Sequence, residues 1–215
     1  MRAEIVKINS DTPESSLIKY AADQIRAGEV LGMPTDTFYG LAADPFNLRA
    51  VDRVYDIKTR SRHKPLSLLI ESVDQAEELA KDLPDEFRAL ARRFWPGPLT
   101  LIVRAGSRLP LKVTANTGNV ALRVPNAKIP LAVVTAAAIP ITATSANLSG
   151  ASECTTAEQV RDQLHGRISI IVDGGTSPRE VASTIIDLTD ENARWKVIRE
   201  GAIPADEIST FFAKG

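Results

Sequence analysis

Residues Thr144 to Gly150 have the side chains best suited to binding a phosphate. They read Thr-Ser-Ala-Asn-Leu-Ser-Gly and follow the apolar run Ile139-Pro140-Ile141. Small hydroxyl residues beside an apolar strand let the backbone approach a phosphate and donate hydrogen bonds to its oxygens. A turn closed by Asn and Ser side chains on their own backbone has the same composition. The sequence contains neither a Walker A loop nor a Gly-x-Gly-x-x-Gly motif, so neither of those nucleotide-binding folds is supported.

A second candidate group is basic and follows a predicted helix. It consists of Lys58, Arg60, Arg62, His63 and Lys64. Forked arginine donors and lysine point charges can together neutralise a polyphosphate. A solvated basic loop is equally well supported, because cations near a helix C-terminus also interact favourably with the helix dipole.

A third candidate group, residues 34–41, reads Pro-Thr-Asp-Thr-Phe-Tyr-Gly-Leu and follows a predicted strand. Open α/β sheets bind ligands beyond the carboxyl ends of their strands, where loop hydroxyls and backbone amides converge. Pro34 and Gly40 are also typical of a simple turn, which composition alone favours.

The charge distribution singles out residues 87–152, which contain no Asp or Glu. This segment carries eight basic residues, namely Arg88, Arg92, Arg93, Arg104, Arg108, Lys112, Arg123 and Lys128. The formal net charge of the whole chain is −1, so the remaining residues sum to −9. Burial of an Ala/Val-rich segment would thin Lys and Arg as well as acids, so we expect the segment to hold something negative.

Length and composition predict one soluble domain spanning residues 1–215. The single cysteine, Cys154, excludes an internal disulfide, and with two histidines it makes a structural zinc site improbable, so we expect no protein-bound metal cluster. The N-terminus has no signal-peptide core and no apolar run reaches membrane-spanning length, which together predict a cytoplasmic protein that does not bind membranes.

Apolar spacing predicts helices and strands that alternate along the chain. Helices are expected over residues 13–28, 48–55, 72–79, 84–94, from 130 onward, 155–166 and from 204 onward, with Thr12, Ser72 and Thr155 as caps. Strands are expected over residues 30–33, 66–70, 99–104, 120–124, 139–144, 168–172, 184–188 and 195–198. Because several late strands are linked too tightly for helical crossovers, we predict an α/β fold, a single three-layer domain with one twisted mixed sheet.

Taken together, the motifs resemble those of the YrdC-like family of threonylcarbamoyl-adenylate synthases. The matching residues, in the family order, are 34–41, Lys58-Thr59-Arg60, 64–66, 95–100, 122–125, 144–150, 183–187 and 198–201. The resemblance covers nearly the whole chain and implies a concave α/β domain with a basic face. The chain stops soon after Gly201, so the extra C-terminal domain of some relatives is not expected here.

The resemblance implies a two-part reaction. L-threonine takes up carbon dioxide or bicarbonate as a carbamate, which attacks the α-phosphate of ATP and yields threonylcarbamoyl-adenylate and pyrophosphate. By family motif, the catalytic cluster at the phosphates is Lys58, Arg60, Ser145 and Asn147, with further ATP contacts from Lys64 and Arg199. Threonine would be held by Thr37, Arg123 and Ser183, with Arg123 on its carboxylate.

The resemblance also implies partners and leaves alternatives. Magnesium is expected with ATP, held chiefly by phosphates and water, and no organic prosthetic group is expected. Downstream proteins would transfer the threonylcarbamoyl group to an adenosine of tRNA. One alternative is a YciO-like protein that binds double-stranded RNA or tRNA without synthase activity. Another is carbamoyl-adenylate formation, as in hydrogenase maturation, which is ranked low because those domains lie within much longer chains.

Overall fold

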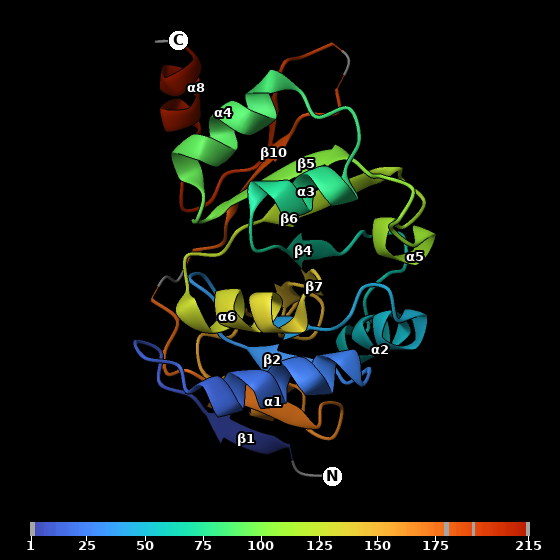
Figure 1. Cartoon of the computed structure of the whole chain (residues 1–215), viewed down its shortest axis with the longest axis vertical. Helices are drawn as coiled ribbons and strands as arrows, with labels where there is room; N and C mark the ends of the chain where they lie inside the picture. The colour runs from blue at the N-terminus through green and yellow to red at the C-terminus, as the bar shows by residue number, and fades with distance from the viewer. Residues whose placement is uncertain (1–2, 179–180, 191, 214–215) are drawn as a thin grey trace.

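The strands of the computed structural model form two mixed sheets, and the structure describes residues 3–178, 181–190 and 192–213. The first sheet has the order β1 (Glu4–Lys7), β9 (Ile170–Asp173), β2 (Leu31–Met33), β3 (Gly40–Ala42) and β8 (Thr144–Ser145). The second has the order β11 (Lys196–Arg199), β10 (Thr184–Asp187), β5 (Leu99–Arg104), β6 (Asn119–Arg123), β4 (Ser67–Leu69) and β7 (Ile141–Thr142). The two sheets lie one above the other in Figure 1.

Both sheets combine parallel and antiparallel pairs. In the first, β9 lies parallel to β1 and β2, whereas β3 is antiparallel to β2 and β8. In the second, β10 is parallel to β5 and antiparallel to β11, as the short link between these late strands predicts. The α/β class and the mixed pairing are therefore confirmed, but the expectation of one sheet is wrong.

The division arises within the strand expected over residues 139–144. The chain instead makes two short strands on either side of Ala143, with β7 pairing to β4 and β8 pairing to β3. The backbone N–H of Ala143 donates to Ser67 O, and that of Thr142 donates to Ala43 O, so both sheets hold this segment. One apolar run thus contributes a short strand to each sheet. Apolar periodicity alone does not predict which sheet each part of the run joins.

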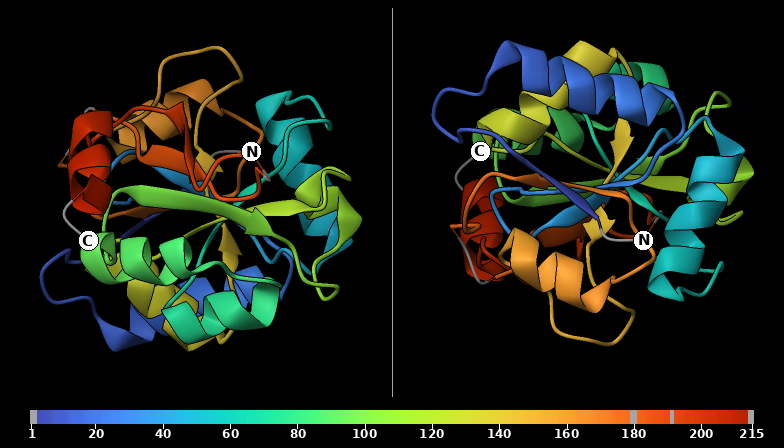
Figure 2. Two further views of the ribbon diagram at one scale, coloured as in Figure 1. Left: turned by 90° about the horizontal axis from the view of Figure 1, so that it is seen from above. Right: turned by 90° about the horizontal axis from the view of Figure 1, so that it is seen from below.

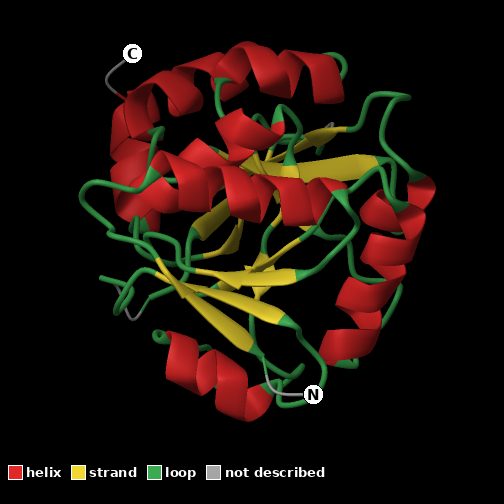
Figure 3. Ribbon diagram, turned by 60° about the horizontal axis from the view of Figure 1, so that its bottom comes forward, coloured by secondary structure: helices red, strands yellow, loops and turns green. Residues whose placement is uncertain are grey.

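Helices cover the strands on both sides (Figures 2 and 3). They are α1 (Ser15–Arg26), α2 (Leu48–Lys58), α3 (Val73–Leu79), α4 (Asp85–Phe94), α5 (Leu111–Thr114), α6 (Lys128–Ala137), α7 (Ala157–Gln163) and α8 (Ala205–Ala213). Figure 2 shows α1 and α6 on one side of the strands and α7 on the other, which gives the expected three layers. None of the helices in the described part of the chain is long and apolar enough to cross a membrane.

The structure confirms one of the three expected helix caps and corrects the other two. Ser72 caps α3 as expected, since its hydroxyl accepts from Gln75 N at 3.2 Å. The cap of α7 is Thr156 rather than Thr155, because the hydroxyl of Thr156 accepts from Gln159 N. Helix α1 begins at Ser15 after Glu14, so the expected cap at Thr12 is wrong. Helix α5 and strands β1 and β3 were not predicted from the apolar spacing.

One apolar cluster extends across both sheets. It joins Leu41 of β3 to Leu68 of β4 and Leu101 of β5, and it continues under α2, α4 and α7. A second cluster packs α1 and α6 against β2 and β9. This shared core fixes the two sheets relative to each other, while the organisation of residues 1–215 as a single domain stays a prediction.

Several basic residues of the acid-free segment form ion pairs with carboxylates from other parts of the chain. Among the described residues, its ion pairs include Arg88–Glu77, Arg93–Glu207, Arg108–Glu78, Lys112–Asp52 and Arg123–Asp36, and every carboxylate in this set lies outside residues 87–152. The first four pairs are largely exposed, whereas the last is buried. These pairs account for part of the positive charge of the segment, and among these five cations Arg123 alone lines the cleft described below.

Candidate functional site

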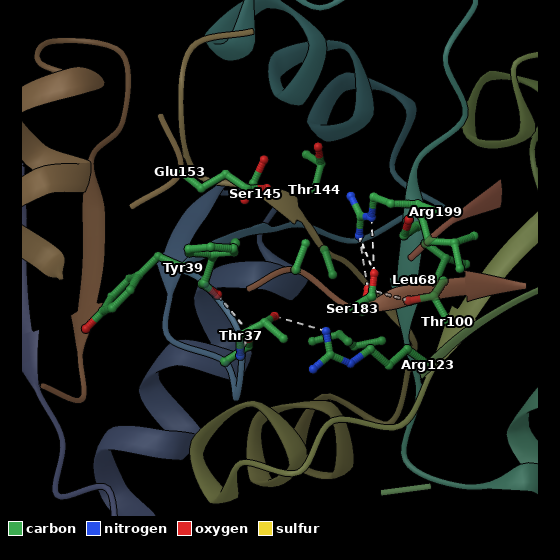
Figure 4. A pocket seen from close by; sticks show the side chains of 18 of the residues that line it. Thr37, Tyr39, Leu68, Thr100, Arg123, Thr144, Ser145, Glu153, Ser183 and Arg199 are labelled. Carbon is green, nitrogen blue, oxygen red and sulfur yellow. Dashed lines mark hydrogen bonds between the residues drawn. The ribbon is translucent and has the colours of Figure 1, made fainter. Parts of the chain in front are cut away.

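A polar cleft of about 190 Å³ lies between the two sheets (Figure 4). Strand ends, the loops beside them and the segment after α2 supply its polar side chains, which include Thr35, Thr37, Arg60, Ser67, Thr100, Arg123, Thr144, Ser145, Glu153, Ser183 and Arg199. Six of the nine residues proposed from the sequence line it: Thr37, Arg60, Arg123, Ser145, Ser183 and Arg199. The topology therefore brings together positions separated by up to 162 residues.

On one side of the cleft, a buried network surrounds Arg123, and we call Asp36, Thr37, Gly97 and Arg123 the Arg123 wall. The guanidinium donates to Gly97 O at 2.9 Å, to Thr37 Oγ1 at 3.1 Å and to Asp36 Oδ1 at 2.5 Å. The side chains of Arg123 and Asp36 are only 8% and 5% exposed. A guanidinium has five N–H donors, so two remain for a ligand in the cleft, the number that a carboxylate takes in a bidentate pair.

Glycine at position 97 lets the backbone reach this guanidinium. A Cβ built at Gly97 would lie 2.3 Å from Phe94 O, a distance that real Cβ atoms do not show. The turn that presents Gly97 O to Arg123 therefore requires glycine. This contact gives a physical reason for the Trp95-Pro96-Gly97-Pro98 element.

The hydroxyls of Thr35 and Thr37 on this side of the cleft are also fixed in place. Thr35 Oγ1 donates to Phe38 O at 2.7 Å and accepts from Thr37 N at 3.1 Å. Its hydroxyl also lies 3.1 Å from that of Thr37. These bonds fix the turn after β2 and hold Thr35 and Thr37 at the cleft. Residues 34–41 are therefore more than the simple turn that composition alone favoured.

Another part of the cleft is formed by Ser183, Thr100 and Arg199. Arg199 donates to Ser183 O through Nε at 3.1 Å and through Nη2 at 2.8 Å, and it reaches Ser183 Oγ at 3.2 Å. The hydroxyls of Thr100 and Ser183 are 2.9 Å apart. Burial is the main cause that lowers the pKa of Arg199. Thr100 was not proposed from the sequence, although a polar residue within an otherwise apolar strand could have indicated it.

Ser145 lies across the cleft from Arg123 (Figure 4). Arg60 also lines the cleft, and with Ser145 and the buried Lys58 and Asn147 it makes up what we call the Lys58 wall. Lys58 is 2% exposed, and its ammonium donates to Asn147 O and Asn147 Oδ1, both at 2.8 Å, and to Ser145 O. Ser145 Oγ donates to Asn147 Oδ1 at 2.7 Å, and Asn147 Nδ2 donates to Ala151 O at 2.6 Å. Lys58 and Asn147 thus lie behind Ser145 and hold its loop in shape.

The electrostatics of the Lys58 wall differ from those of a surface loop. Every acceptor of the Lys58 ammonium is a neutral oxygen, so its charge is not cancelled locally. Burial, followed by repulsion from Arg60, lowers the pKa of Lys58 to about 8. Burial likewise lowers the pKa of Arg60, which donates through Nη2 to Pro65 O at 2.9 Å.

The remaining basic residues of the 58–64 cluster lie outside the cleft. Lys64 is exposed, and its backbone oxygen rather than its ammonium is used, accepting from Tyr55 OH at 3.0 Å. Arg62 pairs on the surface with Asp52 and Asp56. Both interpretations of this basic cluster therefore apply to part of it. Arg60 lines the cleft, whereas residues 61–64 form an exposed loop.

Comparison with known proteins agrees with this geometry. The model of the Sua5/YciO/YrdC family, described as "Telomere recombination", matches residues 23–201. A threonylcarbamoyl-AMP synthase of Pyrococcus abyssi is 40% identical over 193 residues, which are 89% of this chain and 56% of that protein. The chain therefore spans little more than half the length of this relative.

Solved structures give the same family. The crystal structure of P. abyssi Sua5 complexed with L-threonine matches with a TM-score of 0.93 and 38% identity, covering 97% of this chain and 61% of that one. The crystal structure of Escherichia coli YciO matches with a TM-score of 0.84 and 26% identity, covering 93% and 96%. These matches confirm the resemblance drawn from the motifs, and the chain belongs to the Sua5/YciO/YrdC family.

Proposed function

We propose that this protein is an L-threonylcarbamoyladenylate synthase that uses L-threonine, bicarbonate or carbon dioxide, and ATP. The observation that carries the proposal is the pairing of two unlike walls in one cleft. The Arg123 wall has two N–H donors left for a carboxylate, and the Lys58 wall offers uncancelled positive charge and hydroxyls for phosphates. Relatives named threonylcarbamoyl-AMP synthase and a relative solved with L-threonine support it.

Threonine would bind with its carboxylate on Arg123. The Arg123–Asp36 pair is formed in advance, so the guanidinium plane is already set before the ligand arrives. The hydroxyl of Thr37, in the Arg123 wall, and that of Ser183, beside Arg199, also line the cleft and would orient the rest of the amino acid. A free amine reacts with carbon dioxide without a protein base, which suits a cleft with no histidine among its described lining residues.

ATP would bind with its phosphates along Arg60, Ser145 and Arg199. A carbamate oxygen then forms a bond to the α-phosphorus, the bond from that phosphorus to the β-phosphate oxygen breaks, and pyrophosphate leaves with the electron pair. Charge that develops on the phosphate oxygens is stabilised by guanidinium groups and hydroxyls that are already in position. Lys58 would keep the Ser145 loop in place and contribute its charge from behind.

Magnesium belongs to this proposal because ATP carries it. The described residues contain no group of three or more His, Cys, Asp and Glu side chains that could hold a metal by themselves. A cleft without its own set of metal ligands is compatible with Mg²⁺, which keeps several waters and is bound mainly through phosphates. Its chemistry there would be to screen the phosphate charge.

The RNA-binding alternative has less support. Four cations of the acid-free segment, Arg88, Arg93, Arg108 and Lys112, pair with surface carboxylates, which leaves less free positive charge for a nucleic acid backbone. Transfer of the threonylcarbamoyl group to tRNA by downstream proteins remains part of the proposal.

Pyrophosphate release from ATP tests the function. Release that requires both L-threonine and bicarbonate, and that is much weaker with serine, is the expected result. Background release by well-folded protein in the presence of all three substrates would overturn the proposal and favour a YciO-like or RNA-binding role.

A further inference from the structure

Glu153 is a carboxylate in a cleft whose other charged side chains are all cations. Of the described residues that line the cleft, it alone is acidic, and it shares the space with Arg60, Arg123 and Arg199. It follows the Ser145 loop in the chain and precedes the buried Cys154. The side chain is half-buried, so it reaches the cleft rather than bulk solvent alone.

The carboxylate of Glu153 is also unpaired within the described part of the chain. Each of the three arginines donates to a named oxygen, whereas Glu153 has neither a hydrogen bond nor an ion pair with a described residue. Its charge still acts at longer range, because it raises the pKa of Lys58 and of Arg199 against the dominant effect of burial. A charged group held near cations and bonded to none of them has capacity left for a ligand.

The position of Glu153 indicates which ligand. Figure 4 shows its side chain beside Thr144 and Ser145, on the far side of the cleft from Arg123 and Thr37. It therefore lies where the proposed function places phosphates rather than the amino acid. A carboxylate next to phosphates is repulsive unless a cation lies between them.

The oxygens at this position fit a hard cation. The Glu153 carboxylate and the Ser145 hydroxyl offer oxygen donors, which Mg²⁺ prefers. One or two carboxylates together with substrate phosphates are its usual protein environment. Cys154, the adjacent soft donor, is fully buried, and burial raises the pKa of its thiol to about 11, so it stays a thiol and offers no competing ligand.

We propose that Glu153 is a ligand of the Mg²⁺ that enters the cleft with ATP, an inference that rests on the proposed function. Because a single carboxylate holds the ion weakly, the metal site is complete only with the nucleotide bound. Without metal, the same carboxylate repels the phosphates. Glu153 therefore makes ATP binding depend on Mg²⁺ in two ways, by attraction when the ion is present and by repulsion when it is absent.

Titration of ATP in excess Mg²⁺ and in excess EDTA tests this inference by calorimetry. The proteins are the wild type, Glu153→Gln, and Glu158→Gln as a control that removes an exposed carboxylate from the start of α7. In Mg²⁺ we expect Glu153→Gln to bind ATP about tenfold more weakly than the wild type. In EDTA we expect it to bind ATP as tightly as the wild type or more tightly, because a repulsive charge is gone.

A second readout uses Mn²⁺ in place of Mg²⁺. The electron paramagnetic resonance spectrum of Mn·ATP should change on binding to the wild type and to Glu158→Gln, and change less with Glu153→Gln. Equal Mg²⁺ dependence of ATP binding in the wild type and Glu153→Gln would overturn the inference and leave the proposed function standing. Failure of the wild type to bind ATP under both conditions would overturn the proposed function, and this inference with it.

Discussion

Both walls of the cleft contain a buried cation, but only one of these cations has a carboxylate as its hydrogen-bond partner. Arg123 faces the carboxylate of Asp36, so the Arg123 wall is close to neutral. Lys58 faces only the neutral oxygens of Ser145 and Asn147, so the Lys58 wall keeps its positive charge. A neutral wall with aimed donors suits one carboxylate, whereas an uncancelled cation suits a polyphosphate. This difference supports our proposal that the two substrates bind on opposite sides of the cleft.

The largest expected effect comes from breaking the buried pair of the Arg123 wall. Asp36→Ala would leave the Arg123 guanidinium buried without its counter-ion, and a broken buried pair costs about 3 to 5 kcal/mol. Urea unfolding measures the loss. A change below about 1 kcal/mol would mean that Asp36 does not neutralise Arg123.

Removal of the buried ammonium of the Lys58 wall should cost stability as well as ATP binding. Lys58→Ala removes the ammonium that donates to the backbone oxygens of Ser145 and Asn147, and each buried acceptor left unpaired costs about 1 to 3 kcal/mol. Unfolding and ATP titration measure both effects, with Lys112→Ala as an exposed control. Full stability together with lost ATP binding would show that Lys58 contacts ATP directly rather than supporting the loop.

Arg60→Ala sharpens the contrast within the Lys58 wall. Arg60 lines the cleft, so we expect ATP to bind about tenfold to a hundredfold more weakly, with less than about 1 kcal/mol lost in stability. Arg62→Ala, two residues away and paired on the surface, is the matched control. If Arg60→Ala binds ATP as tightly as Arg62→Ala and the wild type do, Arg60 does not contact ATP.

The pH dependence of ATP binding should reflect Lys58. Its pKa is lowered to about 8, so the ammonium is mostly present at pH 7 and mostly lost at pH 9. Deprotonation removes one positive charge and one of the three donors, which weakens ATP binding as the pH rises through about 8. Calorimetric titration from pH 6.5 to 9.5 should show this loss in the wild type. Constant affinity over that range would contradict the assigned role.

The smallest effect is expected on the outer surface. Arg88→Ala removes an exposed pair with Glu77, and such pairs contribute about 0.2 to 1 kcal/mol. ATP and threonine affinity should not change, because Arg88 lies outside the cleft. A loss of ligand binding in this variant would restore the idea that the acid-free segment as a whole binds an anion.

Local patterns predicted most elements but not how they share two sheets. Strand β5 and the Ser72 cap of α3 were predicted at their observed positions, because apolar runs and caps are local features. The division around Ala143 depends on pairing with β3 and β4, which lie far away in the sequence. In the site, the motifs indicated Arg123 and Ser145, but they did not indicate Asp36 as the partner of Arg123 or Glu153 in the cleft. Those residues are identified by contacts across the fold, which no single segment encodes.

Calorimetric titration of Arg123→Lys and Arg60→Ala with each ligand tests the assignment of two substrates to two walls most directly. Arg123→Lys keeps a cation beside Asp36 but loses the forked donors, so it should bind threonine at least about tenfold more weakly and ATP as the wild type does. Arg60→Ala should show the reverse. If Arg123→Lys binds threonine normally, or if both variants lose both ligands equally, the two walls do not bind separate substrates.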